Sequence, residues 1–185
     1  KISKEDGINV YWGSMKYSNN MNFTKRAISF ISFIFFVLRV GNKLDFDIII
    51  ASSTPLTVGI PALILKKIKK TKLIFEVRDV WPQLPIAIGA IKSKFLIKIL
   101  RKIESKIYRE SEKIIALSDG MKNEIQKVED KPDKIVVITN LCDTKSFNIK
   151  KYSGKNFRSK FLGIKNEPLI VYAGSFGKIN NAAYL

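Results

Sequence analysis

Histidine is absent from this 185-residue chain, and cysteine occurs once, at Cys142. Without histidine, neither a Ser-His-Asp triad nor a Cys-His pair can form, so hydrolases of those types are excluded. A zinc site would lack its usual ligands, so we expect no metal. A single cysteine also excludes an internal disulfide framework. Cys142 has no base to activate it as a nucleophile. The composition fits a cytoplasmic, reducing compartment, and acid–base chemistry would fall to Asp, Glu, Lys or Tyr.

Acidic residues are scarce beside basic ones. The chain has 16 Asp and Glu against 33 Lys and Arg, which gives a formal net charge of +17. Such an excess attracts anionic partners. Many of the lysines alternate with isoleucine, as over residues 66–72, so an ordinary solvated face is an equal alternative to a face that binds an anionic membrane. Nucleic acid is not expected as a partner, because arginine is scarce and the sequence has no helix-turn-helix, RNP-like or zinc-knuckle pattern.

No apolar run in the sequence is long enough to span a bilayer. The most apolar segment, residues 27–38, has about 12 residues where a spanning helix needs about 20. A helix that packs on a sheet and grazes the bilayer interface is the better interpretation. Lys1 in place of an initiator methionine, and an end just after a strand-like run, indicate a fragment of a longer protein.

Strand-like apolar runs alternate with amphipathic helical patterns along most of the chain. Strands are predicted at 8–12, 47–52, 72–77, 113–117 and 134–139. Helices are predicted at 22–43, from the turn at 53–55 to about 70, at 94–111 and at 118–128, with a loop at 78–89. This alternation is typical of right-handed βαβ crossovers. It indicates an α/β fold with a Rossmann-like, doubly wound parallel sheet whose two faces are both covered by helices.

The composition changes after residue 147. Between 148 and 166 it is rich in Lys, Asn, Ser and Gly, apart from a short helix-like patch at 157–162. We therefore expect an incomplete α/β domain over 1–147, a linker with a short helix over 148–167, and the truncated start of a second α/β domain over 168–185, beginning with a buried strand at 169–172.

The loop after the predicted strand at 72–77 carries the densest set of functional groups. Ligands of open parallel sheets bind beyond the carboxyl ends of the strands. There, Glu76, Arg78 and Asp79 bring charges together with the aromatic ring of Trp81. Carboxylates and a guanidinium suit hydroxyls or phosphate, and an aromatic face suits a sugar ring. In the structural alternative, Asp79 caps a turn, Arg78 pairs with Glu76, and Trp81 fills a hole under the loop.

The other strand ends offer weaker signals. The loop at 52–55 belongs to the same predicted edge of the sheet. Ser118 either caps its helix or contacts a ligand, and Asn140 is equally well a turn residue. Gly174 and Gly177 would let the backbone approach a diphosphate at a helix N-terminus, although a strand-to-helix turn needs glycine in any case.

Several blocks resemble one known family. Residues 75–89, FEVRDVWPQLPIAIG, resemble the FEVRDLWPxxPIxxG block of family 4 retaining glycosyltransferases, in the branch that builds bacterial O-antigen and capsule repeats. Further matches follow in the family's order: SSTPLT at 52–57, IALSDGMK at 115–122 and VITNLCD at 137–143. YAGSFG at 172–177 resembles the opening strand and loop of the donor domain. The resemblance covers nearly the whole chain.

The resemblance implies a GT-B architecture of two Rossmann-like domains facing a cleft. It implies sugar transfer, with retention and without an obligatory metal or other cofactor, from a nucleotide-diphosphate sugar, usually UDP-linked. The implied acceptor is a polyprenyl-diphosphate-linked or other saccharide at the inner face of the plasma membrane, which would make the enzyme cytoplasmic and peripheral. An anionic membrane surface would then be a partner of the basic chain. Since the main donor-binding half is absent, we expect the fragment alone to be inactive.

The resemblance also implies roles for particular residues. Asp79 would orient or deprotonate the acceptor hydroxyl, and Arg78 would steady a phosphate. The implied substrate-binding residues are Thr54, Pro55, Glu76, Trp81, Ser118 and Asn140. The implied contacts to the donor diphosphate are Gly174, Ser175, Gly177 and Lys178. Ser175 departs from the basic residue of many relatives, and residues 140–143 lack the glycine of the family's Asn-Gly-x-Asp ending. The alternative to an enzyme is a basic α/β module that binds a membrane surface without catalysis.

Overall fold

The computed structural model describes residues 1–18, 21–148, 151, 154–162 and 167–174. These residues belong to two compact units, Lys1–Thr139 and Asn140–Leu185. The domain limits expected at residues 147 and 167 stay a prediction. Ser175, Gly177 and Lys178, the expected contacts to a donor diphosphate, lie outside the described residues.

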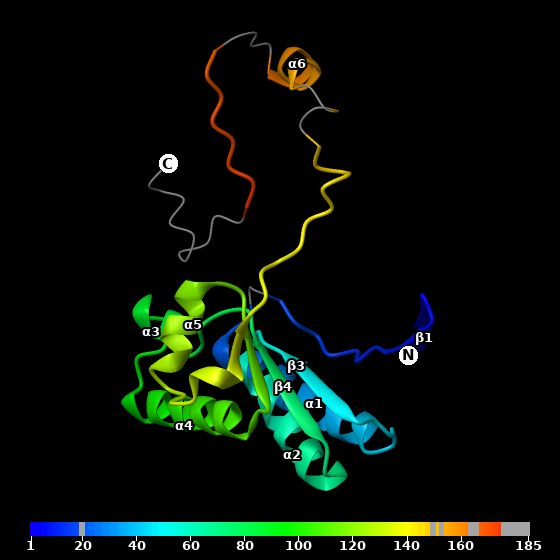
Figure 1. The fold of residues 1–185 in the computed structure, drawn as a ribbon, viewed down its shortest axis with the longest axis vertical. Coiled ribbons are helices and arrows are strands. Elements are labelled where there is room, and N and C mark those ends of the chain that lie inside the picture. Colours follow the sequence, from blue (N-terminus) through cyan, green and yellow to red (C-terminus); the bar gives the residue numbers. More distant parts are fainter. Residues whose placement is uncertain (19–20, 149–150, 152–153, 163–166, 175–185) are drawn as a thin grey trace. The chain divides into compact units, whose positions relative to one another are not determined.

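A four-stranded parallel sheet forms the centre of the first unit (Figure 1). Its strands are β3 (Ile48–Ser52), β4 (Lys72–Val77), β5 (Lys113–Ala116) and β6 (Ile135–Val137), which lie side by side in that order. Ser52 is level with Glu76, and Val77 with Ala116. The carboxyl ends of β3, β4 and β5 therefore meet at one edge of the sheet.

The predicted strand at 8–12 forms, but in a separate hairpin. Strand β2 (Ile8–Tyr11) pairs antiparallel with β1 (Ile2–Glu5), and neither strand joins the parallel sheet. Asp6 and Gly7 connect the two strands with φ of 49° and 86°. Asp-Gly readily adopts such positive φ values, which a tight two-residue hairpin turn requires.

Helices connect the parallel strands as the sequence predicts. Helix α1 (Phe23–Gly41) precedes β3, and among the described residues no helix is long and apolar enough to cross a membrane. A 3-10 turn at Leu56–Val58 and helix α2 (Gly59–Lys69) join β3 to β4. Helix α4 (Lys94–Glu110) leads to β5, and α5 (Asp119–Gln126) with a 3-10 turn at Pro132–Lys134 leads to β6.

The predicted loop at 78–89 contains a short helix, α3 (Gln83–Ala87). The two prolines of this segment had indicated a loop. Pro82 instead occupies the cap position, and Pro85 lies in the first turn of the helix, where no backbone N–H donor is needed. The loop prediction was therefore wrong over these residues.

Polar side chains mark where the longer helices begin. The side chain of Asn22 accepts a hydrogen bond from the backbone N–H of Lys25 (3.0 Å). Ser93 Oγ accepts one from Leu96, and Ser118 Oγ accepts one from Met121, both at 3.3 Å. Such caps satisfy backbone donors that have no partner within the helix.

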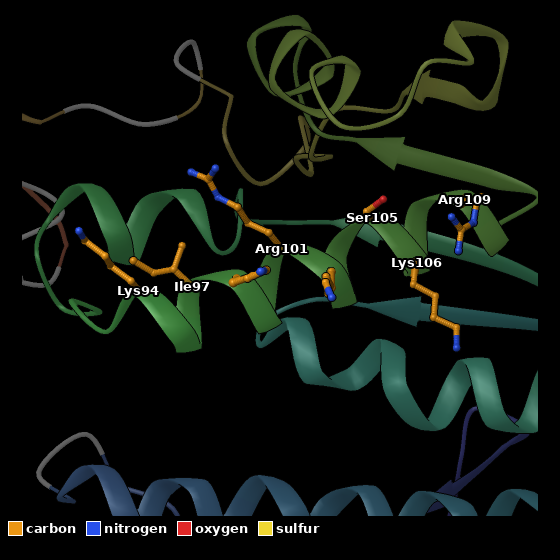
Figure 2. Close-up of a pocket in the computed structure, with 8 residues that line it drawn as sticks. Lys94, Ile97, Arg101, Ser105, Lys106 and Arg109 are labelled. Carbon is orange, nitrogen blue, oxygen red and sulfur yellow. The ribbon is translucent and has the colours of Figure 1, made fainter.

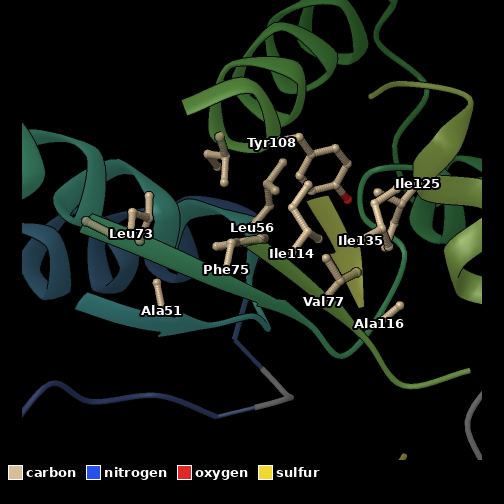
Figure 3. Packing of buried hydrophobic residues seen from close by; sticks show 12 residues of the cluster. Ala51, Leu56, Leu73, Phe75, Val77, Tyr108, Ile114, Ala116, Ile125 and Ile135 are labelled. Atoms are coloured by element: carbon tan, nitrogen blue, oxygen red, sulfur yellow. The ribbon is translucent and has the colours of Figure 1, made fainter. Parts of the chain in front are cut away.

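The core lies between the sheet and helices α2, α4 and α5. In a sheet whose neighbours follow the chain order, right-handed crossovers place all connecting helices on one face. The buried side chains on that face form one cluster (Figure 3): Ala51, Leu56, Ala62, Leu73, Phe75, Val77, Ile107, Tyr108, Ile114, Ala116, Ile125 and Ile135. Gly59 of α2 lies so close to α4 that an added Cβ would be 2.3 Å from Cδ1 of Ile107. The two helices are therefore in close contact.

The opposite face of the sheet is largely uncovered. Ile48, Ile50 and Val136 point away from the core and are 50%, 67% and 41% exposed. The expectation of helices over both faces is thus not met within the described residues, because every crossover of β3 to β6 lies on the same side. The α/β class with a Rossmann-like parallel sheet is confirmed.

The second unit contains little regular structure among its described residues. Helix α6 (Lys155–Phe157) continues into a π-helical stretch at Arg158–Leu162, where the sequence predicts a helix-like patch. The buried strand predicted at 169–172 is wrong, since these residues form no regular element and Ile170 is 89% exposed. The apolar pattern is present, but a strand forms only where another strand accepts its hydrogen bonds.

Candidate functional site

The carboxyl ends of β3 and β4 are joined through Ser53. Its backbone N–H donates to the carbonyl of Glu76 (2.9 Å), and its side-chain oxygen accepts from the backbone N–H of Arg78 (3.0 Å). The neighbouring hydroxyl of Ser52 donates to Oε2 of Glu76. Ser53 is buried, and a buried polar side chain with satisfied hydrogen bonds holds its surroundings in one arrangement. The loops after the two strands are therefore fixed relative to each other.

A second bond joins the same two loops further out. Thr54 Oγ1 donates to Oδ2 of Asp79 at 2.5 Å, the short distance expected for a hydroxyl bound to a carboxylate. The backbone N–H of Trp81 donates to the carbonyl of Asp79 (2.9 Å). The peptide bonds preceding Pro55 and Pro82 are both cis. Thr54, Asp79 and Trp81 thus form a connected rim at the sheet edge.

A cavity of about 600 Å³ lies beside this rim. Its lining comes from the segment before α1, from α1 itself and from the loops after β3 and β4: Met15, Tyr17, Arg26, Ser29, Phe30, Phe33, Ser52, Thr54, Pro55, Val58 and Trp81. The lining combines apolar and aromatic side chains with hydroxyls and one guanidinium. Cavities of this size and character bind small ligands, including sugars.

Local contacts hold the α1 side of the cavity in place. The rings of Tyr17 and Phe30 stack with centroids 5.8 Å apart. Ser29 Oγ donates to the carbonyl of Lys16 at 2.6 Å, which ties α1 to the segment that precedes it. Arg26 Nη2 donates to the carbonyl of Met21 at 3.3 Å. The guanidinium therefore enters the cavity wall from the first turns of α1.

The outward side of α1 is unusually apolar for a surface helix. Ile28, Ile31 and Phe35 follow one another at helical spacing and are 63%, 52% and 67% exposed. They lie on the side opposite to Ser29 and Phe33, which line the cavity. One helix therefore contributes a cavity wall and an exposed apolar stripe.

The structure brings a subset of the predicted site residues together. Thr54, Pro55 and Trp81 line the cavity, and Asp79 is bonded to Thr54 at its rim. Glu76 is bonded to Ser52, and among the described residues it forms no ion pair with Arg78. Arg78 is exposed and takes part through its backbone N–H.

Ser118, which belongs to the first unit, does not join this group. Its hydroxyl caps helix α5, which is the structural role that the sequence offered as the alternative to contact with a ligand. Asn140 and Gly174 belong to the second unit, where both are exposed. In the described residues, no cluster of three or more His, Cys, Asp or Glu side chains is placed to hold a metal ion.

Sequence reasoning missed the contribution of α1. Arg26, Ser29 and Phe33 line the cavity together with Tyr17, whereas the sequence predicted a helix that packs on a sheet and grazes the bilayer interface. A signal was present, because Arg26, Ser29, Phe30 and Phe33 recur at the spacing of three and four residues that places side chains on one helix face. An arginine and a serine on an otherwise aromatic face are unusual for a purely packing surface.

Two titratable groups of the first unit with perturbed pKa values, Glu104 and Tyr108, are not part of this cavity. Burial raises the pKa of Glu104 to about 7, while a hydrogen bond with Tyr108 and the charge of Arg101 oppose the rise. Burial and the neighbouring Glu104 also raise the pKa of Tyr108 well above its ordinary value. Glu104 borders a second, smaller cavity of about 340 Å³ between α4 and α5. The choice of the rim as the candidate site therefore rests on its geometry and not on a shifted pKa.

Comparison with known proteins assigns the chain to a family. The model described as Glycosyltransferase Family 4 matches residues 4–146. The match includes all strands of the parallel sheet and the rim formed by Thr54, Asp79 and Trp81. No curated protein matches the chain. With the parallel sheet, the rim and the matched range in agreement, the chain belongs to glycosyltransferase family 4.

Proposed function

We propose that the cavity beside the rim receives the acceptor of a glycosyl transfer. The donor would be a nucleotide-diphosphate sugar, UDP-linked, and the acceptor a polyprenyl-diphosphate-linked or other saccharide in the synthesis of a bacterial surface polysaccharide such as O-antigen or capsule. The reaction would take place at the cytoplasmic face of the plasma membrane. The observation that carries the proposal is the bond between Thr54 and Asp79 at the mouth of a cavity bordered by Trp81.

The cavity lining suits a saccharide. The ring of Trp81 offers an apolar face against which the C–H groups of a pyranose can pack. The hydroxyl of Tyr17 can donate to and accept from sugar hydroxyls, and that of Ser52, whose proton is donated to Glu76, can still accept. Arg26 brings a positive charge to the wall, which favours an acceptor that carries phosphate. Pro55 also lines the cavity, and Glu76 holds the hydroxyl of Ser52 in the lining.

Asp79 is the group best placed to act on an acceptor hydroxyl. Thr54 occupies its Oδ2, and within the described residues no hydrogen bond reaches Oδ1. Oδ1 can accept a hydrogen bond from the acceptor hydroxyl and take its proton as the hydroxyl oxygen bonds to the anomeric carbon. The bond from that carbon to the diphosphate breaks, and the nucleoside diphosphate departs with the electron pair. The proposed transfer keeps the anomeric configuration and requires no metal.

The charge of the departing diphosphate needs donors that are already in position. Arg78 is exposed at the end of β4 and would steady a phosphate, while Ser118 and Asn140 would contact substrate from neighbouring loops. Gly174 and the following Ser175, Gly177 and Lys178 would hold the donor diphosphate. At Gly174 an added Cβ would lie 2.7 Å from Oη of Tyr172, so a side chain there would displace the end of that ring.

Asp79→Asn tests the proposal in the complete glycosyltransferase. The amide keeps the shape of the side chain but cannot take a proton, so kcat should fall by about 10² or more while the KM for the acceptor changes less. Turnover is measured with a UDP-sugar and a lipid-linked acceptor. Asp130→Asn is the matched control, because Asp130 is an exposed acid in the loop before β6, at the amino end of that strand and not at the carboxyl ends where Asp79 lies. Equal turnover of both variants would remove Asp79 from the mechanism.

A further inference from the structure

The outward face of helix α4 is a continuous row of cations. A shallow groove of about 640 Å³ runs along it, and Figure 2 shows basic side chains projecting from the helix into this region. The cations recur every three or four residues along one face: Lys94, Lys98, Arg101, Lys102, Lys106 and Arg109. At 1.5 Å per residue, the row is roughly 20 Å long.

In the described part of the chain, the buried Glu104 interacts through its charge with Arg101 of this row. None of its members forms a salt bridge, whereas lysines elsewhere do: Lys66 with Glu110, Lys127 with Glu124, and Lys134 with Glu129. The remaining acid of α4, Glu104, is turned inward and is 5% exposed. The outward face of α4 therefore carries positive charge only.

An exposed aromatic side chain lies among the cations. Phe95 is 75% exposed, and Lys98 and Lys102 follow it at spacings of three and seven residues, on the same side of the helix. Ile99 borders this side and is 37% exposed. Lysines that surround an outward-facing Phe are characteristic of helices that lie in the interface of an anionic membrane.

We infer that α4 docks the protein on a membrane that contains anionic phospholipids. A straight row of cations matches a planar array of headgroups, since a single bound phosphate would leave most of the row unused. Phe95 gives the apolar contact that a purely electrostatic attraction lacks. The inference rests on the proposed function for its location at a membrane, but its test involves no sugar transfer, so either can fail without the other.

Flotation of the whole chain with vesicles tests the inference. Vesicles of phosphatidylcholine alone are compared with vesicles that also contain phosphatidylglycerol. The chain should float only with the anionic vesicles, and its binding should weaken as salt rises. The variant Lys98→Glu/Lys102→Glu/Lys106→Glu should bind the anionic vesicles about a hundredfold more weakly, because each of the three lysines near such a surface contributes about a factor of five.

The control variant carries the same change in net charge at exposed lysines outside α4: Lys4→Glu/Lys16→Glu/Lys43→Glu. Its binding should fall by less than about tenfold, since charges beyond a Debye length of about 8 Å are screened. Phe95→Ser should also weaken binding without altering net charge.

Several results would overturn the inference. Equal losses in the two triple variants would mean that net charge alone drives binding. Flotation with phosphatidylcholine vesicles that survives high salt would mean that α4 is not the contact. Loss of duplex DNA binding in the α4 variant, with vesicle binding unchanged, would identify the row as a nucleic-acid surface instead.

Discussion

Glu104 shows how one side chain on α4 can influence the stability of the whole domain. It is 5% exposed, is hydrogen-bonded to Tyr108, and has a pKa raised to about 7 by burial. An unfolded chain would titrate the same carboxyl near 4.5. The folded protein therefore binds more protons than the unfolded one between these pH values, and its stability falls as pH rises through that window.

We expect Glu104→Gln to remove this pH dependence. The difference in free energy of unfolding between the variant and the unmutated chain should grow in favour of the variant by about 2 kcal/mol from pH 5 to pH 8, because Gln bears no charge to bury. Urea unfolding at several pH values measures the difference. A constant difference across the range would show that Glu104 does not titrate in this window.

At the scale of elements, the ends of helices and strands are specified locally. Ser118 lies between β5 and α5 and accepts the backbone N–H of Met121. The same hydroxyl is proposed to contact substrate, so its contribution to stability has to be measured separately from its contribution to activity. Unfolding of the isolated chain measures the structural part alone.

Ser118→Ala should destabilise the chain by about 1 kcal/mol through loss of the cap on α5. Ser118→Asp should keep most of that stability, since its carboxylate caps equally well and favours a helix N-terminus. Chemical denaturation of the three proteins compares them. Midpoints that do not differ would show that the serine cap contributes nothing to the stability of α5.

The sequence predicts the elements of the sheet well and the cavity only in part. The strands at 48–52 and 72–77 are recognisable because a strand buried in a parallel sheet is a short, continuous apolar run. Thr54 and Trp81 could be placed at a site because strand ends converge at one edge. The wall formed by α1 could not, because which face of a helix meets which loop depends on contacts between segments distant in sequence.

At the scale of the molecule, the outer face of the sheet exposes several apolar side chains. Ile48, Ile50 and Val136 are exposed there, whereas Ile114 on the other face is fully buried. Exposed apolar surface on a sheet favours association between copies of a protein. Substitutions on the two faces should therefore differ in their effects on stability and on self-association.

Ile50→Thr should change the free energy of unfolding by less than about 0.5 kcal/mol and should reduce self-association. Ile114→Thr, the same chemical change on the covered face, should cost about 2 kcal/mol or more, because it leaves a void and buries a hydroxyl. Thermal unfolding and light scattering of both variants are compared. Similar losses of stability in the two variants would mean that the outer face is covered in solution.

The contact between Gly59 and Ile107 carries a geometric consequence. Gly59 begins α2 a few residues after Pro55 of the cavity lining, and its lack of a side chain lets Ile107 of α4 lie directly against the backbone. Helix α4 and the cavity are therefore linked through direct packing on α2. If α4 docks on lipid as we infer, this packing would help to set the height and tilt of the cavity opening above the bilayer.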